Sequence, residues 1–436
     1  MLSDINLIKV SIWIYQRWCS KFEKSGITTA ISTKQRGSFR EEATLKKFYE
    51  SNMRENQESV EISKSQNVSR KLASIILLSY NSRNDLKECI PSLINQTYTN
   101  YEIIIVDNAS TDNTPEFIRI EYPNIKLVET GSNLGYPAGN NIGVDNAKGD
   151  YIIILNPDTV ADPNWLLQLI KPLLENPDIA LTTSKILLYD DHEKINTCAN
   201  SVHYTGLDFC RGLYEPSASF SINEEAGAIS GCSFAVRKEV FKELGGFDPD
   251  FFLYLEDVDL SWRARLAGYR IMFVPASIVY HKFRLSIAPW KEFYLERNRY
   301  LMLLKNCSFK MLILMSPALF VSEIVTWGHA IIYGYSYMYN KLKAYCWILM
   351  NPGKIMKKRH LAQMNRRIND KEFIRLLEWE IPFEQVIQNR FMRITANKVF
   401  NSFFRIYYKL LDACLVDTGR YAKFLNFKAL NKQGML

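Results

Sequence analysis

Six ionisable side chains stand where the sequence pattern would let them do chemistry. They are, in chain order, Asp107, Asp158, Glu256, Asp257, Asp259 and His281. Two carboxylates and a histidine suit a divalent cation, Mg²⁺ or Mn²⁺, that keeps positions open for phosphate. A further carboxylate nearby suits general-base work on a hydroxyl. The set therefore fits transfer of a group away from a diphosphate, whose negative charge a metal would neutralise.

Simpler interpretations remain open for several of these residues. Asn156-Pro157-Asp158 is good turn chemistry as well as a place for a ligand. Asp259 is as well explained by the favourable field at a helix N-terminus as by function. His281 taken alone is compatible with an ordinary packed histidine. Trp165 and Trp262 are better explained as core residues than as platforms for a sugar ring.

Short apolar strands alternate with helical patterns around these residues. Strands are predicted over 73–81, 101–110, 124–129, 151–155, 233–237 and 269–275. Helices are predicted over 85–95, 111–122, 138–147, 164–173, 238–244 and 260–267. The stretch from 174 to about 227 shows no alternation and is predicted to be mixed and rich in loops. Strands that alternate with helices predict a doubly wound, mostly parallel sheet, whose carboxyl ends bring Asp107 and Asp158 to one edge.

A glycine-rich segment, GSNLGYPAGNNIG (131–143), lies between the strands that carry Asp107 and Asp158. Its glycines recur every four residues, so a helix formed there would lie close to the sheet or to a ligand. Tight packing explains the glycines but not the polar Asn133, Asn140 and Asn141 beside them. The dinucleotide fingerprint G-x-G-x-x-G is absent.

Charge and hydropathy separate the C-terminal part from the rest. The net charge is +8, and residues 354–436 hold 17 Lys and Arg against 7 Asp and Glu, which is +10 and leaves about −2 for the remainder. Residues 311–335 are apolar over 25 positions but contain Pro317, Glu323 and His329. This combination favours a pair of helices on or partly in an anionic membrane surface. No nucleic-acid motif occurs, so nucleic acid is not the expected partner.

The cysteines and the N-terminus favour a reducing compartment. The eight cysteines are scattered without a C-x-x-C or a zinc-like Cys/His spacing, which favours free thiols in the cytosol. The first residues lack a small-residue cleavage site, so a secretory signal is not expected. The predicted organisation is an extension or linker over 1–70, an α/β domain over 71–300 and a helical, apolar and then basic region over 301–436.

Six blocks of sequence resemble the family 2 inverting glycosyltransferases, especially the rhamnosyltransferase-like branch. The blocks are 74–81, 103–112, 131–143, 151–159, 227–270 and 279–281. The resemblance covers about residues 72–300, and six motifs in order and at the right spacing do not recur by chance. It implies a GT-A fold, an α/β fold with a mostly parallel central sheet, to which the C-terminal helical membrane-associating region is added.

The resemblance also implies roles for individual residues. Tyr80, Asn81, Asp107 and Asn133 would contact the nucleotide sugar, with Asp107 on the base. Asn156-Pro157-Asp158 stands at the family's Asp-x-Asp metal motif, where Asn156 replaces the first Asp. Asn156 and Asp158 would also contact the nucleotide sugar, and Asp158 would carry the divalent metal, Mg²⁺ or Mn²⁺, with the diphosphate, with His281 as second metal ligand. Asp257 matches the catalytic base, and Glu256 and Asp259 would orient the acceptor or support that base. Arg297 and Arg299 would face donor or lipid phosphates.

The predicted function is transfer of a sugar from a nucleotide-diphosphate donor to a hydroxyl of a lipid-linked or polysaccharide acceptor. The enzyme would serve cell-surface glycan synthesis as a peripheral or monotopic protein at the cytoplasmic side of the cell membrane. The alternative is a non-catalytic nucleotide-sugar-binding scaffold with the same fold. A degenerate copy would be expected to lose Asp158 or Asp257, and both are present. No pattern names the sugar, the nucleotide, the linkage or the oligomeric state.

Overall fold

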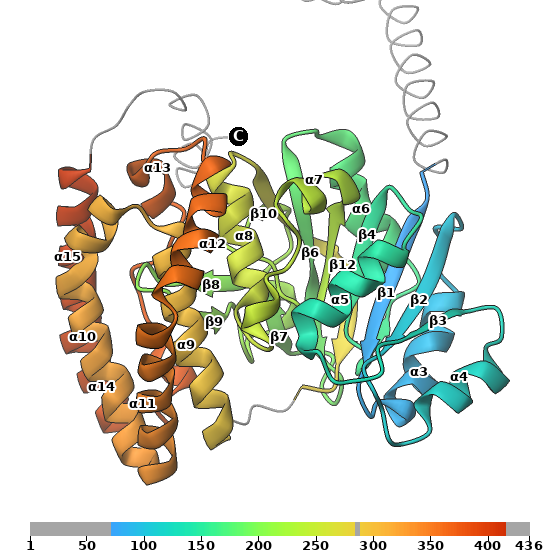
Figure 1. The fold of residues 1–436 in the computed structure, drawn as a ribbon, viewed down its shortest axis with the longest axis horizontal. Helices are drawn as coiled ribbons and strands as arrows, with labels where there is room; N and C mark the ends of the chain where they lie inside the picture. The colour runs from blue at the N-terminus through green and yellow to red at the C-terminus, as the bar shows by residue number, and fades with distance from the viewer. Residues whose placement is uncertain (1–70, 284–287, 416–436) are drawn as a thin grey trace, which may run out of the picture. The chain divides into compact units, whose positions relative to one another are not determined.

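A computed structural model describes residues 71–283 and 288–415, which belong to one compact unit (Figure 1). The predicted linker over 1–70 lies outside the described residues. The sheet and its covering helices occupy one side of this unit, and a layer of C-terminal helices occupies the other. The predicted division into domains stays a proposal.

The central sheet has the strand order β10-β12-β6-β11-β4-β1-β2-β3, with β5 paired to β12 and β7 to β6. Strands β1, β2, β3 and β4 run parallel, as predicted, and β11 is antiparallel to both of its neighbours. The strands are β1 (Ala73–Ser79), β2 (Tyr101–Asp107), β3 (Lys126–Glu129), β4 (Tyr151–Leu155), β5 (Thr159–Ala161), β6 (Ile179–Leu188), β7 (Ile195–Cys198), β10 (Glu224–Glu225), β11 (Ser233–Arg237) and β12 (Arg270–His281). A separate hairpin pairs β8 (Asn200–Val202) with β9 (Asp208–Cys210).

Helices cover both faces of the sheet because its strands are apolar on both faces. Alternate residues of β1 show this, since Ile75 packs on one face and Ile76 on the other. The first face is covered by α3 (Arg83–Ile94), α4 (Thr114–Glu121) and α6 (Trp165–Glu175), and the second by α5 (Gly135–Asn146), α7 (Lys238–Glu243) and α8 (Glu256–Leu266).

The glycine stripe is explained by contact between α5 and the sheet. A Cβ atom on Gly139 would lie 2.3 Å from Leu78, and one on Gly143 would lie 2.4 Å from Ile76. Such distances are impossible for real side chains, so glycine is required for α5 to lie this close to β1. Asn140 and Asn141 also have structural roles, because their side-chain amides donate to the carbonyls of Tyr136 and Phe247.

The sequence interpretation was wrong for the stretch after α6. Residues expected to be mostly loop contain β6, a ten-residue strand buried along almost its whole length. Three consecutive residues near its middle, Thr182-Thr183-Ser184, are polar. They interrupt the apolar run that marks the other buried strands. These hydroxyls are satisfied internally; Ser184 Oγ, for example, lies 2.8 Å from Ser233 Oγ. Strand β12 is also longer than predicted and ends on His281.

Seven helices follow the sheet among the described residues and pack around a second apolar core. They are α9 (Pro289–Asn306), α10 (Phe309–Tyr333), α11 (Tyr335–Met350), α12 (Pro352–Met364), α13 (Asp370–Ile374), α14 (Arg390–Ala396) and α15 (Ser402–Cys414). This core also takes in Phe251, Val258 and Trp262 from the loop before α8 and from α8 itself. The C-terminal helices therefore share a core with the helix that carries the acidic pair.

The apolar segment predicted to be a helix pair is one helix, α10, with Pro317 inside it. It is the one helix in the described part of the chain that is long and apolar enough to cross a membrane by length and composition. One side of α10 faces the protein and is buried at Met311, Met315, Ala318 and Ser322.

Candidate active site

The carboxyl ends of β1 and β2 form the first part of the site. Asn81, held at φ 55°, accepts hydrogen bonds from the amide and hydroxyl of Thr111 at 2.7 and 3.2 Å. Asp107 accepts the Ser110 amide at 3.0 Å through Oδ2, while its Oδ1 is buried without a hydrogen-bond partner. Tyr80 is half exposed beside them. A carboxylate oxygen without a partner and an exposed aromatic ring therefore lie at the same edge of the sheet.

Asn133 lies at the same edge but is tied to the protein. Its Oδ1 accepts hydrogen bonds from the side chain of Asn108 and the amide of Gly135, both at 3.0 Å. Asn108, which the sequence interpretation missed, is buried, and its own Oδ1 accepts the amide of Leu134. Asn108 therefore links the end of β2 to the start of α5. In the sequence, the one signal for a role of Asn108 was its position directly after Asp107.

Asp158 and His281 meet at the ends of β4 and β12. The distance from His281 Nε2 to Asp158 Oδ2 is 3.4 Å, and His281 Nδ1 lies 2.8 Å from Asn196 Oδ1. Burial alone would lower the pKa of His281, but Cys232 and Asp158 outweigh it and raise that pKa to about 10. Asn156, two residues before Asp158, donates its amide to the carbonyl of Cys232.

This pair fits the predicted metal site in part. Asp158 Oδ1 is buried with no partner, and a carboxylate and an imidazole side by side are ligands that a divalent cation accepts. Among the residues described, no three His, Cys, Asp or Glu side chains are grouped to hold a metal ion. Any cation held here would therefore need further oxygen ligands, which a diphosphate or water can supply.

Glu256 and Asp257 begin α8 and are both buried. Asp257 accepts the amide of Gly231 at 2.7 Å through Oδ2 and the amide of Val258 at 2.8 Å through Oδ1. Burial raises the pKa of Asp257, although these amides oppose the shift. Burial and the neighbouring Asp257 raise the pKa of Glu256 well above its usual value. A carboxylate with a raised pKa is a stronger base than an exposed one.

Tyr136 of α5 lies next to the start of the acidic pair's helix. Its hydroxyl donates to the carbonyl of Gly231 at 2.6 Å. Burial raises the pKa of Tyr136 well above its usual range, and the charges of Glu256, Asp257 and Asp158 add to the shift. The Tyr136 hydroxyl and the Asp257 carboxylate are therefore both bonded to the backbone of Gly231. The sequence interpretation did not single out Tyr136, because Gly-Tyr-Pro is typical of a helix start.

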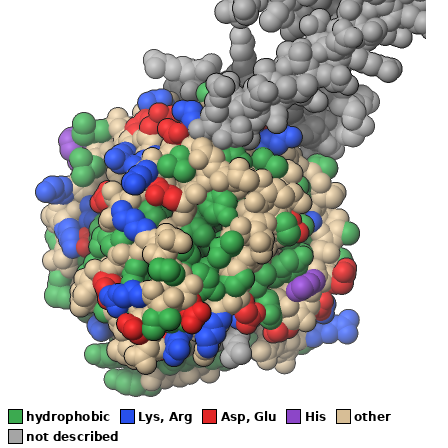
Figure 2. All heavy atoms as spheres, turned by 90° about the vertical axis from the view of Figure 1, so that its right-hand side faces the viewer, with side chains coloured by type: hydrophobic (Ala, Val, Ile, Leu, Met, Phe, Trp, Pro, Cys, Tyr) green, Lys and Arg blue, Asp and Glu red, His purple; other side chains and the backbone are tan. Residues whose placement is uncertain are grey.

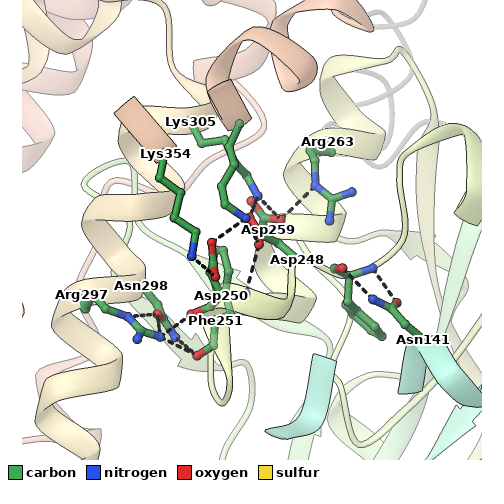
Figure 3. Close-up of polar contacts among 12 residues, drawn as sticks. Asn141, Asp248, Asp250, Phe251, Asp259, Arg263, Arg297, Asn298, Lys305 and Lys354 are labelled. Carbon is green, nitrogen blue, oxygen red and sulfur yellow. Dashed lines mark hydrogen bonds and ion pairs between the residues drawn. The ribbon is translucent and has the colours of Figure 1, made fainter. Parts of the chain in front are cut away.

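The loop before α8 is held in an unusual conformation by α9 (Figure 3). Phe252, Tyr254 and Leu255 have φ values of 58°, 69° and 64°, which side chains of this size rarely adopt. The Asn298 amide donates to the carbonyls of Phe251, Leu253 and Tyr254 at 3.0, 2.8 and 2.8 Å. Arg297 donates to the carbonyls of Asp250 and Phe251 at 2.6 and 2.7 Å. The strained backbone leads directly into Glu256.

Two sequence predictions for α9 were therefore wrong. Arg297 faces the loop carbonyls, not a phosphate. Arg299 is 2% exposed and pairs with Glu296 at 2.7 Å and with Glu323 of α10. Both guanidinium groups are occupied by protein because the carbonyls and carboxylates around them are buried and need donors.

The predicted acceptor contact of Asp259 is also contradicted. Asp259 is fully buried, and its oxygens accept hydrogen bonds from Arg263 at 2.9 Å, Lys305 at 2.8 Å and Asn306 at 2.8 Å. Figure 3 shows Asp259 in contact with Arg263 of the same helix, α8, and with Lys305 of α9. Asp259 lies two positions after Asp257, so the helix turns it away from the acidic pair and into the protein.

The face of the molecule at the β3 edge carries charges of both signs. Figure 2 shows Lys and Arg interspersed with Asp and Glu around a mixed apolar and polar centre. Nucleic-acid surfaces are instead dominated by positive charge.

Comparison with known proteins identifies the class. Residues 74–245 match the family model described as "Glycosyl transferase family 2". The region contains β1, β2, β4 and β11, the strands from which most of the site is built. Residues 74–245 therefore carry a family 2 glycosyltransferase domain, and the sheet built on them has the mostly parallel α/β arrangement of the GT-A fold, as the sequence motifs indicated.

Individual relatives are distant. Over 237 residues the chain is 27% identical to N-acetylglucosaminyl-diphospho-decaprenol L-rhamnosyltransferase of Mycobacterium tuberculosis, covering 48% of this chain and 75% of the relative. It is 26% identical to poly-beta-1,6-N-acetyl-D-glucosamine synthase of Staphylococcus epidermidis over 207 residues, which are 47% of this chain and 48% of the relative. A solved structure of GalNAc-T7 with UDP, GalNAc and Mn2+ has a TM-score of 0.46 and 20% identity, covering 54% of this chain and 48% of that one.

Proposed function

We propose that the enzyme is an inverting glycosyltransferase that moves a sugar from a nucleotide-diphosphate sugar to an acceptor hydroxyl. The observation that carries this proposal is the environment of Asp257. The carboxylate is buried and is oriented by the amides of Gly231 and Val258, and the Gly231 carbonyl also accepts the hydroxyl of Tyr136. An in-line displacement at the anomeric carbon needs a general base that is held in a fixed orientation, and backbone amides hold this carboxylate.

The reaction balances with the residues present. Asp257 takes the proton of the acceptor hydroxyl while that oxygen bonds to the anomeric carbon. The bond between the anomeric carbon and the diphosphate oxygen breaks, and its electron pair leaves with the nucleoside diphosphate. Asp158 and His281 would hold a divalent cation, Mg²⁺ or Mn²⁺, which when bound neutralises the diphosphate charge. Tyr80, Asn81 and Asp107 would bind the nucleotide, with Asn133 and Asn156 shaping the pocket.

The acceptor is proposed to be lipid-linked or a polysaccharide in cell-surface glycan synthesis. The two named relatives act, by their names, on a lipid diphosphate sugar and on a polysaccharide. The distribution of apolar side chains supports a membrane-bound acceptor. Of the 27 exposed large hydrophobic residues in the described part of the chain, 21 lie at or after Phe309.

A membrane-surface position fits the C-terminal helices better than a spanning one. The outer side of α10 exposes Ile313, Phe320, Ile324 and Ile331, whereas its inner side carries Glu323 in contact with Arg299. Helices α14 and α15 expose Phe391, Ile394, Ile406 and Leu410 beside the exposed basic residues Arg390, Lys398, Arg405 and Lys409. Apolar side chains flanked by cations suit the surface of an anionic leaflet, which for a cytosolic enzyme is the cytoplasmic side of the cell membrane.

The decisive experiment is donor turnover by the purified full chain against UDP-, GDP- and dTDP-sugars, with Mn²⁺ or with EDTA. We expect one donor to be turned over. Asp257→Asn should reduce its turnover by roughly 100-fold or more without changing donor affinity. Asp145→Asn is the matched control, because Asp145 is exposed on α5. Failure of every donor to bind would overturn the proposal, and turnover that Asp257→Asn leaves intact would overturn the role of Asp257.

A further inference from the structure

Tyr136, at the start of α5, is hydrogen-bonded at both of its ends to segments that border the acidic pair. Its hydroxyl donates to the carbonyl of Gly231 at 2.6 Å. Its backbone amide donates to the carbonyl of Phe252, four residues before Glu256, at 2.7 Å. Its ring packs edge to face against Phe247, with the two ring centroids 5.9 Å apart. The backbone, the ring and the hydroxyl of this residue are therefore all held by the protein.

Gly231 connects the tyrosine hydroxyl to the base. Its amide donates to Asp257 Oδ2 at 2.7 Å, while its carbonyl accepts the hydroxyl of Tyr136. The carbonyl of the next residue, Cys232, accepts the amide of Asn156 at 2.9 Å. The backbone of residues 231–232 is therefore bonded to the start of α5, to the base at the start of α8 and to the end of β4.

The space around Gly231 is filled by the two side chains that it bonds. A Cβ atom on Gly231 would lie 3.2 Å from Asp257 Oδ2 and 3.4 Å from the hydroxyl oxygen of Tyr136. The first of these distances is tighter than ordinary van der Waals contact, so a side chain here would push the carboxylate out of its place. Glycine thus allows the carboxylate to approach the amide closely.

The start of α5 is itself fixed in place. Gly135 has a φ of 80°, and a Cβ atom there would lie 2.4 Å from the carbonyl oxygen of Phe252. The Gly135 amide donates to Asn133 Oδ1 at 3.0 Å, and the same oxygen accepts the side chain of Asn108. Tyr136 is therefore anchored both to the end of β2 and to the loop before α8. Its hydroxyl is a fixed point against which Gly231 is held.

We propose that Tyr136 is a positioning residue, which fixes the orientation of the Asp257 carboxylate through Gly231. The inference rests on the proposed function, because it takes Asp257 as the general base. Without the hydroxyl of Tyr136, the carbonyl of Gly231 loses this donor and the backbone of residues 231–232 is free to turn. The Gly231 amide then moves away from Asp257 Oδ2. Such a movement matters because a misplacement of about 1 Å can cost a rate factor of about 100.

The test removes the hydroxyl alone and compares two backgrounds. Tyr136→Phe, made in the full chain, keeps the ring packed against Phe247 and keeps the backbone bond to Phe252. With the donor that wild type turns over, we expect kcat to fall roughly tenfold or more, with the dissociation constant of the donor unchanged. In the Asp257→Asn background the same change should lower kcat only about threefold or less, because the side chain that Tyr136 positions is no longer a base.

Gly231→Ala is the second variant, because it disturbs the same link without changing the tyrosine. The added methyl group meets Asp257 Oδ2, so we expect a fall in kcat of roughly tenfold or more in the wild-type background and about threefold or less in Asp257→Asn. If Tyr136→Phe does not fold, this variant decides the outcome by the same comparison of backgrounds.

Tyr101→Phe is the matched control for the loss of a tyrosine hydroxyl. The Tyr101 hydroxyl donates to the carbonyls of Leu93 and Ile94 at 2.7 and 3.1 Å. Tyr101 begins β2, whereas the predicted site residues follow the ends of the strands. We expect Tyr101→Phe to retain the wild-type kcat.

Three results would overturn the proposal. They are a wild-type kcat in Tyr136→Phe, equal fractional losses of kcat in the two backgrounds, and a loss in Tyr101→Phe as large as that in Tyr136→Phe. The second and third would show that the hydroxyl serves the fold alone. The proposed function fails separately, if wild type turns over no donor or if Asp257→Asn leaves turnover intact.

Discussion

The side-chain amide of Asn298 donates to the carbonyl of Tyr254 at 2.8 Å, two residues before the buried acidic pair. Asn298 is fully buried, and the same amide reaches the carbonyls of Phe251 and Leu253. One residue of α9 thus fixes three carbonyls of a loop whose φ angles are unfavourable. Residues outside the family match therefore determine where Glu256 and Asp257 stand.

Replacing Asn298 with Ala should reduce turnover by a larger factor than it reduces the fraction of folded protein. The change leaves loop carbonyls without a donor, which costs about 1–3 kcal/mol, and it frees the loop to leave its strained conformation. We expect turnover to fall roughly tenfold or more, at a temperature well below melting, with donor affinity unchanged. Asn146→Ala, which removes one amide-to-carbonyl bond within α5, is the control. Equal fractional losses of folded protein and of activity would contradict a positioning role.

Changing Asp259 separates its structural role from the acceptor role predicted from sequence. Asp259→Asn leaves Lys305 and Arg263 buried with reduced compensation, so we expect a loss of about 3–5 kcal/mol in the free energy of unfolding. Chemical denaturation measures it, with the exposed Asp145→Asn as control. A variant with wild-type stability but weaker acceptor binding would instead support the sequence prediction.

Stability should depend on pH through Glu292 of α9. Burial, and then the charge of Glu296, raises the pKa of Glu292 from 4.5 to about 7. Between these pH values the folded chain holds a proton that the unfolded chain has released, so the free energy of unfolding falls as the pH rises. Glu292→Gln should equal wild type near pH 4.5 and exceed it by up to about 3 kcal/mol at pH 8. The exposed Glu121→Gln should follow wild type throughout, and parallel curves for Glu292→Gln and wild type would exclude this effect.

Membrane binding should depend on the outer face of α10. Phe320 is 68% exposed there, and Ile120 on α4 is exposed to a similar extent, 64%. Phe320→Glu should weaken sedimentation with phosphatidylglycerol vesicles roughly tenfold or more, because it removes about 1.5–3 kcal/mol of apolar burial. Ile120→Glu should have no effect, and added salt should weaken binding of all forms. Equal effects of the two variants would place the membrane contact elsewhere.

The sequence predicted most of the sheet because β1, β2 and β4 are apolar runs that end in polar residues. The positions of Asp107 and Asp158 at such strand ends could therefore be predicted, and their roles stay predictions. Strand β6 could not be predicted. Its threonine and serine residues are typical of a loop in sequence, and the partners that allow their hydroxyls to be buried are seen only in the structure. The roles of Asp259, Arg297 and Arg299 were mistaken for a similar reason, since a charged residue beside a motif does not reveal which buried partner it has.

The ion pairs between α12 and the start of the strained loop bear on how such enzymes can diversify. Lys354 lies 2.6 Å from Asp250, and Lys358 pairs with Asp250 at 2.7 Å and with Asp248. The family match ends at residue 245, yet these partners lie more than 100 positions later in the chain. If recombination joined this catalytic half to a foreign C-terminal half, the two aspartates would lose their lysine partners and the loop would be held less firmly. A chimera with a different C-terminal half would therefore need other cations to hold Asp248 and Asp250 in place.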